Sequence, residues 1–148
     1  MKDKLLPKFI FDKGIISEFG EIAWNKNNVF EAIEEIVKLN YAILGGDVWA
    51  LKNVDIHNSN DQIEYQNIYV GIIPFKNGSD TVCNWSSNKS QNENWSDFVL
   101  RSKKEALNFI NKSNVENRVK EGLNDKIYYC LVFTNELEFN ELLEKMKK

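Results

Sequence analysis

The stretch from Ala42 to Trp49 constrains the fold more than any other part of this sequence. It reads Ala-Ile-Leu-Gly-Gly-Asp-Val-Trp and directly follows a well-marked helical pattern. A short apolar run of this kind predicts a buried strand, here interrupted by two glycines and one acid. Strand periodicity gives one face the residues Ile43, Gly45, Asp47 and Trp49. A carboxylate is therefore expected on a face that is otherwise apolar or bare backbone.

Asp47 has two interpretations at this position. A buried carboxylate is costly unless it is hydrogen-bonded or paired, so it is either a structural anchor that accepts backbone hydrogen bonds or a contact for a partner. Gly45 and Gly46 leave room for another backbone or a partner to come close, which makes them candidate elements of a structural motif. They do not indicate a phosphate-binding loop, because that fingerprint needs more glycines and a helix directly after them.

The rest of the chain alternates helical and strand patterns. Capping signals predict helices that begin at Asn28, with Glu31 completing a capping box, at Asn94 and at Asn135. A shorter helix is expected over residues 12–19. Strand patterns cover residues 42–51, 67–73, 81–86 and 127–133, and a hairpin is expected within residues 54–65 around the polar run 58–61. These elements predict an α+β fold, with a mostly antiparallel sheet of about four to five strands and helices packed on its faces.

Composition limits the classes of function. The 148 residues are expected to form a single domain over residues 1–148. A net charge of −3 argues against nucleic acid as a partner and slightly favours basic proteins. The sequence shows neither an export signal nor a membrane-spanning run, and Cys83 and Cys130 lie apart in apolar strand-like runs, which is typical of reduced thiols. We therefore expect a cytoplasmic protein, whose oligomeric state stays open.

No set of residues predicts catalysis, a metal site or a cofactor. The only histidine, His57, falls in the polar hairpin, and one histidine with two separated cysteines does not supply the ligands of a zinc site. Ser102 sits inside an apolar helical stripe, where a small residue allows close packing and its hydroxyl can bond back one turn. A nucleophilic serine would need an oriented base, so Ser102 is assigned to the structural motif with Gly45 and Gly46.

Tryptophan and acidic residues are the candidates for partner binding. Most tryptophans are expected in the core, but Trp49 and Trp85 lie beside polar residues in strand-like segments, and tryptophan is enriched at binding hot spots. We predict a partner-binding cluster of Asp47, Trp49, Asn84 and Trp85, drawn from two strands that could be neighbours. Two acidic helices, around residues 31–35 and 136–144, are either solvated surface or a face that steers a basic partner.

These residues also carry a resemblance to a known family. The order of Glu21-Ile22-Ala23-Trp24, an amphipathic helix, Ile43 to Trp49, Asn84-Trp85 and Arg101-Ser102 with Ala106 resembles the Immunity protein 40 family over about residues 15–133. One departure is Ser86, where the family is expected to place an aromatic residue. The resemblance implies a cytoplasmic immunity protein of a bacterial polymorphic toxin system, which binds a cognate toxin domain and blocks it sterically.

Two other hypotheses remain beside this one. The chain could be a small enzyme or ligand-binding domain whose pocket is lined by Asp47, Asn84 and Ser102. It could also be a structural domain in which the Gly-Gly-Asp segment only holds the fold together. A deep polar pocket around an Asp47 with a perturbed pKa would favour the enzyme or ligand-binding hypothesis.

Overall fold

The structure is a computed structural model that describes residues 5–52 and 62–147. Its helices are α1 (Lys8–Phe11), α2 (Lys26–Lys38), α3 (Trp95–Ser113), α4 (Val115–Arg118) and α5 (Glu136–Met146). Its strands are β1 (Ile15–Ser17), β2 (Ile22–Asn25), β3 (Ala42–Leu51), β4 (Gln62–Ile63), β5 (Ile68–Val70), β6 (Ile72–Pro74), β7 (Asp80–Val82), β8 (Asn84–Ser86) and β9 (Ile127–Thr134), with a short 3₁₀ turn, η2 (Tyr65–Asn67), before β5.

The predicted α+β class is confirmed, but the sheet is larger than expected. Seven strands form the main sheet in the order β4-β1-β2-β9-β3-β5, and β8 pairs with the same edge of β3 as β5 does. All of its pairings are antiparallel except the parallel pair of β1 and β4. Strands β6 and β7 form a separate two-stranded ribbon. The expected count of four to five is too low because several of these strands are only two or three residues long, too short for a periodic pattern to reveal.

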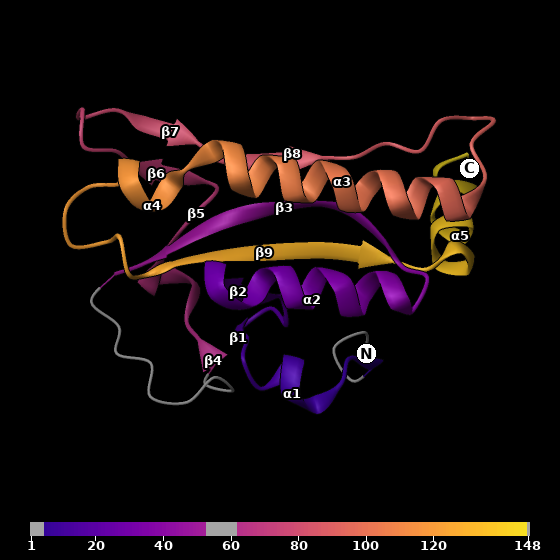
Figure 1. Ribbon diagram of the computed structural model, residues 1–148, viewed down its shortest axis with the longest axis horizontal. Helices are drawn as coiled ribbons and strands as arrows, with labels where there is room; N and C mark the ends of the chain where they lie inside the picture. Colours follow the sequence, from indigo (N-terminus) through magenta and orange to yellow (C-terminus); the bar gives the residue numbers. More distant parts are fainter. Residues whose placement is uncertain (1–4, 53–61, 148) are drawn as a thin grey trace.

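Helices α2 and α3 lie side by side along β3 and β9, as Figure 1 shows. Their apolar stripes bury Val29, Ile33, Ile36, Ala106 and Ile110. These side chains share one core with inward-facing residues of the sheet. Helix α5 packs at the N-terminal end of α3, where Phe139 contacts Trp95 and Phe98.

The other face of the sheet carries a smaller apolar cluster. Its buried members are Ile15, Ala23, Trp49, Leu51, Ile63, Ile68 and Cys130. All seven lie on strands, and among the described residues no helix contributes to the cluster. We call this face, opposite α2 and α3, the open face because no described helix covers it; the cluster itself is buried, with every member at most 5% exposed.

Two local expectations were wrong. Residues 12–19 do not form a helix, because β1 turns back on β2 there. The turn is closed by Ser17, whose hydroxyl accepts hydrogen bonds from the backbone N–H groups of Phe19 and Glu21, 3.2 Å each. The cap of α2 is Asn25, three residues before the expected cap Asn28, and its side chain accepts a hydrogen bond from the Asn28 N–H at 3.1 Å. The caps predicted at Asn94 and Asn135 are confirmed.

The expected hairpin over residues 54–65 cannot be followed as a unit, because residues 53–61 lie outside the described part of the chain. His57 lies in the same undescribed stretch. The described end of the hairpin is β4, which pairs with β1. Among the described residues, none of the helices has the length and apolar character needed to cross a lipid bilayer.

Candidate functional site

Strand β3 carries a bulge at Leu44. The pairing with β9 runs from Ile43 opposite Phe133 directly to Gly45 opposite Val132, so Leu44 is an extra residue on β3. A bulge reverses the alternation of side chains along the strand beyond it. Ile43 therefore faces the helices with the main core. The prediction that it shares a face with Asp47 was wrong for this reason.

Beyond the bulge, alternation holds as predicted. Asp47 pairs with Cys130, and Trp49 packs with Cys130 in the open-face cluster. Trp49 has 0% of its surface exposed. Its indole N–H finds no acceptor among the described residues, so the tryptophan supports the open face from within rather than presenting surface of its own.

The two glycines let neighbouring strands come close to β3 at the bulge: Gly45 faces the β8 backbone, and Gly46 faces the β9 backbone and the Trp85 ring. A β-carbon on Gly45 would overlap with the carbonyl oxygen of Trp85, and one on Gly46 would overlap with the carbonyl oxygen of Cys130 and the ring of Trp85. A side chain at either position would push β8 or β9 away from β3. The assignment of this pair as a structural motif thus has a steric basis.

Trp85 occupies the space that Gly46 leaves. Its ring stacks on Phe109 of α3 with centroids 4.6 Å apart and an interplanar angle of 24°. The indole is half-buried on the helix side of the sheet and packs against the main core. Its N–H, like that of Trp49, has no acceptor among the described residues. Trp85 therefore ties β8 to α3.

A hollow of about 630 Å³ opens above the bulge. It is lined by Leu44, Gly45, Gly46, Asp47, Asn84, Trp85, Ser86 and Val132. The strand register explains this set, because Asp47 pairs with Asn84 and Gly45 pairs with both Ser86 and Val132. The missing side chain at Gly45 leaves the floor low, and Val132, 44% exposed, forms an apolar wall. We refer to this feature below as the hollow.

Asp47 is the ionisable group of the hollow. The carboxylate is half-buried, and burial raises its pKa. No described residue donates a hydrogen bond to it or forms an ion pair with it within 4.0 Å. The predicted structural role, a carboxylate satisfied by backbone hydrogen bonds, therefore has no donor in the described structure. What the geometry provides is a carboxylate available to a ligand.

Glu21 lies close enough to Asp47 to interact with it electrostatically. Burial and the negative charge of Asp47 together raise the pKa of Glu21. Burial raises the pKa of the Cys130 thiol well above its usual value, and the charges of Glu21 and Asp47 raise it further. The turn that Ser17 closes places Glu21 beside β2, across β9 from Asp47. The open face therefore carries negative potential next to the hollow.

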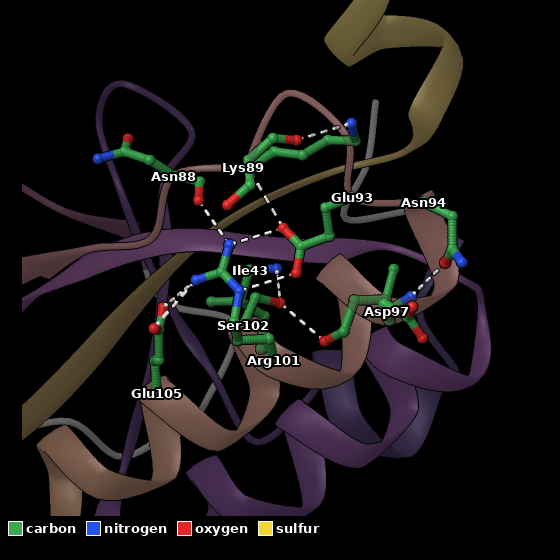
Figure 2. A network of polar contacts seen from close by, with 11 residues as sticks. Ile43, Asn88, Lys89, Glu93, Asn94, Asp97, Arg101, Ser102 and Glu105 are labelled. Atoms are coloured by element: carbon green, nitrogen blue, oxygen red, sulfur yellow. Dashed lines mark hydrogen bonds and ion pairs between the residues drawn. The ribbon is translucent and has the colours of Figure 1, made fainter.

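Ser102 lies elsewhere. It is fully buried on α3, where its hydroxyl accepts a hydrogen bond from the Ile43 N–H at 2.9 Å and donates one to the Val99 carbonyl oxygen at 2.8 Å (Figure 2). The expected bond back one turn is thus present, and the second bond fixes α3 to β3 beside the bulge. Because Ser102 faces the helix side, it does not line the hollow with Asp47 and Asn84.

Arg101, the neighbour of Ser102, organises the loop before α3. Its guanidinium donates two hydrogen bonds of 2.8 Å to the Glu93 carboxylate and also binds Glu105 and the Asn88 carbonyl oxygen (Figure 2). The hydrogen bond to Arg101 lowers the pKa of Glu93 to about 2. Residue-by-residue reading of the sequence missed this network, although an arginine beside several acids was a visible signal.

The described residues offer little for other chemistry. No group of three or more histidine, cysteine, aspartate or glutamate side chains that could hold a metal ion occurs among them. Cys83 and Cys130 are both free and buried, and they belong to cores on opposite faces of the sheet. The acids of α2 are engaged with lysines, since Glu34 pairs with Lys103 at 2.7 Å.

Comparison with known families places this chain among the immunity proteins, the class that neutralises toxins. The chain matches the family model described as Immunity protein 40 over residues 13–133, and it belongs to that family. The match contains the bulge, every residue of the hollow and the Arg101-Ser102 pair, and it ends before α5. No curated protein and no solved structure gives a match.

Proposed function

We propose that residues 1–148 act as a single cytoplasmic immunity domain that binds its cognate toxin domain and blocks it sterically. The contact surface is the open face around the hollow, with Asp47 and Asn84 at the surface. Trp49 and Trp85 hold that surface in place, Trp49 within the open-face cluster and Trp85 against α3. The mechanism requires no turnover, cofactor or metal.

The observation that supports this surface most strongly is the half-buried, unpaired Asp47 in the hollow. A polar group that is buried without a hydrogen-bond partner lowers the free energy of unfolding. Among the described residues, four further buried polar atoms have no hydrogen-bond partner: the indole N–H of Trp49 on β3, the hydroxyl of Ser87 just after β8, the indole N–H of Trp85 on the helix side, and Glu116 Oε2 on α4. Sites with uncompensated polar groups are typical of surfaces that a ligand completes.

The hypothesis of a ligand-binding or enzymatic pocket has one observation in its favour, the raised pKa of Asp47 in a hollow. The position of Ser102 argues against this hypothesis. Ser102 lies on α3, on the other side of the sheet, and does not line a pocket together with Asp47 and Asn84. Among the described residues that line the hollow, Asp47 is also the only ionisable one. General acid-base chemistry would need a second group there.

Co-expression tests the proposal directly. Candidate toxin domains taken from the neighbouring genes are produced in cells with and without the protein, and growth is measured. The purified pair is then examined by size-exclusion chromatography with light scattering, and toxin activity is titrated with the protein. Steric occlusion predicts rescue of growth, a stable complex, and inhibition that is complete only at stoichiometric amounts.

Hydrogen exchange on the complex locates the surface. Protection at residues 44–47 and 84–86 is expected upon binding, with little change at the exposed face of α2. Loss of toxin activity at far below stoichiometric amounts would instead indicate an enzyme, and protection confined to the helices would move the contact to the other side of the sheet.

A further inference from the structure

We infer that the hollow binds the cationic end of one lysine or arginine side chain of the toxin, a specificity that rests on the proposed function. The side chain's stem would pack on Leu44 and Val132, and its charged end would reach Asp47. The hollow would thus select a basic residue at one position of the partner surface.

Charge opposes acidic and apolar ligand side chains in the hollow. Asp47 lies in the hollow and Glu21 is near enough to interact with it, so an acidic side chain would meet repulsion from both carboxylates. An apolar side chain would bury Asp47 further without compensating its charge, which is costly. A cation relieves both problems, because it pairs with a carboxylate that has no basic partner among the described residues.

The shape of the hollow fits a long side chain with an apolar stem. Val132 provides an exposed apolar wall, Leu44 lines the hollow while it packs against the cluster of Trp95, Phe98 and Val99, and the glycines at 45 and 46 leave the floor as backbone. Lysine and arginine pack their methylene stems along apolar surface while their charged ends reach polar groups. Asn84 pairs with Asp47 across β8 and β3, so its amide oxygen is a second acceptor beside the carboxylate.

A metal ion fits the same residues poorly. Calcium takes six to eight oxygen ligands and magnesium six, whereas the side-chain oxygens in the hollow come only from Asp47, Asn84 and Ser86. The described residues also contain no cluster of three or more acidic, histidine or cysteine ligands. A lysine or arginine side chain fits better than a metal ion, because the apolar walls of the hollow can contact its methylene stem while Asp47 pairs with its charge.

Charge reversal tests the pairing in the complex with the toxin domain that co-expression identifies. Asp47→Lys is expected to weaken binding roughly 30-fold or more, and Asp47→Asn roughly tenfold. Glu121→Gln, which removes one exposed charge in a turn after α4, should change affinity less than about twofold. One lysine or arginine of the toxin, replaced by glutamate, should restore binding to Asp47→Lys by about tenfold or more.

Equal affinity of wild-type protein and Asp47→Asn for the toxin, with the fold of both verified by circular dichroism, would overturn the inference and leave the proposed function intact. Absence of any complex would contradict the proposed function instead. The hollow is then judged by NMR titration with N-acetyl-argininamide and N-acetyl-lysinamide. We expect saturable chemical-shift changes at the backbone amides of residues 45–47 and 84. These changes should be absent in Asp47→Asn and absent with neutral N-acetyl-glutaminamide. Unchanged amide shifts in the wild type would overturn the inference.

Discussion

At the scale of single residues, Asp47 shows the conflict between folding and binding most clearly. Its carboxylate is half-buried, its pKa is raised, and it has no donor among the described residues. A residue of this kind weakens the fold, which is typical of a binding site. The sequence predicted that a carboxylate would stand on an otherwise apolar face. It did not reveal whether backbone donors would reach it, because that depends on the register of β8 against β3.

Asp47→Asn should raise the melting temperature at pH 7 by roughly 1–4 °C. The folded-state pKa of Asp47 lies above the unfolded value of about 3.9, so the ionised form destabilises the fold at neutral pH. That penalty disappears as the pH falls through the raised pKa toward 3.9, so the advantage of the variant should shrink in this window. Thermal denaturation from pH 7 to pH 4 measures it.

Asp80→Asn, the same chemical change at an exposed site on β7, is the control and should leave the melting temperature nearly unchanged at each pH. A melting temperature several degrees lower in Asp47→Asn would restore the structural anchor as the role of Asp47.

Gly46→Ala should destabilise the protein by about 1–3 kcal/mol, because its methyl group would overlap with the Cys130 carbonyl oxygen and the Trp85 ring. Gly78→Ala is the comparison, since nothing lies within 4 Å of a β-carbon there and only the positive φ of +86° opposes it. Urea denaturation gives the two free energies of unfolding, and tryptophan fluorescence reports whether the stack of Trp85 on Phe109 has moved. Equal costs at both glycines would show that β3 and its neighbours can separate freely.

At the scale of elements, α3 is fastened to the rest of the fold by two consecutive residues. Ser102 binds the β3 backbone beside the bulge, and Arg101 binds the loop that leads from β8 into α3 (Figure 2). The helix thereby fixes β3 and the loop that follows β8, next to the hollow. Sequence patterns predicted α3, its cap and the buried position of Ser102, since these depend on local spacing.

Other elements could not be predicted from local spacing. Residues 15–17 fit helical spacing as well as strand spacing, and only their pairing with β2 decides between them. The bulge at Leu44 likewise depends on the register against β9, which no local pattern encodes. The hollow exists because of that bulge. The sequence therefore predicted Asp47 and Asn84 as candidate site residues, but it predicted neither the shape of the hollow nor that Ser102 would lie outside it.

Ser102→Ala should cost about 1–3 kcal/mol of stability, because the buried Ile43 N–H loses its acceptor. Ser96→Ala, at an exposed position of the same helix, should stay within about 0.5 kcal/mol of the wild type. Chemical denaturation compares the two variants. Hydrogen exchange should in addition show faster exchange of the Ile43 amide in Ser102→Ala, and an unchanged rate would mean that this bond does not protect the strand.

Arg101→Gln should destabilise the protein at neutral pH and lose this effect in acid. The pKa of Glu93 is about 2 in the fold, below the unfolded value of about 4.3. Its contribution to stability is therefore present above pH 4.3 and is lost as the pH falls from there toward 2. The difference in melting temperature between wild type and variant should narrow in this window.

Lys38→Gln, which removes an exposed i,i+3 pair with Glu35, is the control and should show a difference near zero at every pH. A penalty for Arg101→Gln that stays constant from pH 7 to pH 2.5 would assign the stabilisation to the bond with the Asn88 carbonyl oxygen instead.

At the scale of the whole molecule, the two faces of the sheet are built differently. One face is covered by α2 and α3, and the acids of α2 are engaged with lysines there (Figure 1). The open face carries the strand-only cluster, the hollow and the carboxylates of Asp47 and Glu21. Because of this asymmetry, most side chains of the main core lie on one face of the sheet, and the residues proposed to contact the toxin lie on the other.

Binding kinetics should reflect that separation. A half-buried contact acts after the partners have met, so Asp47→Asn should raise koff roughly tenfold while kon changes less than about twofold. Charges at the rim act on the encounter, so kon of the wild type for a basic toxin should fall as ionic strength rises and koff should respond less. Surface plasmon resonance at several salt concentrations measures both rates. If Asp47→Asn lowered kon and left koff unchanged, Asp47 would act only through its field, and the toxin would have to dock on a surface away from the hollow.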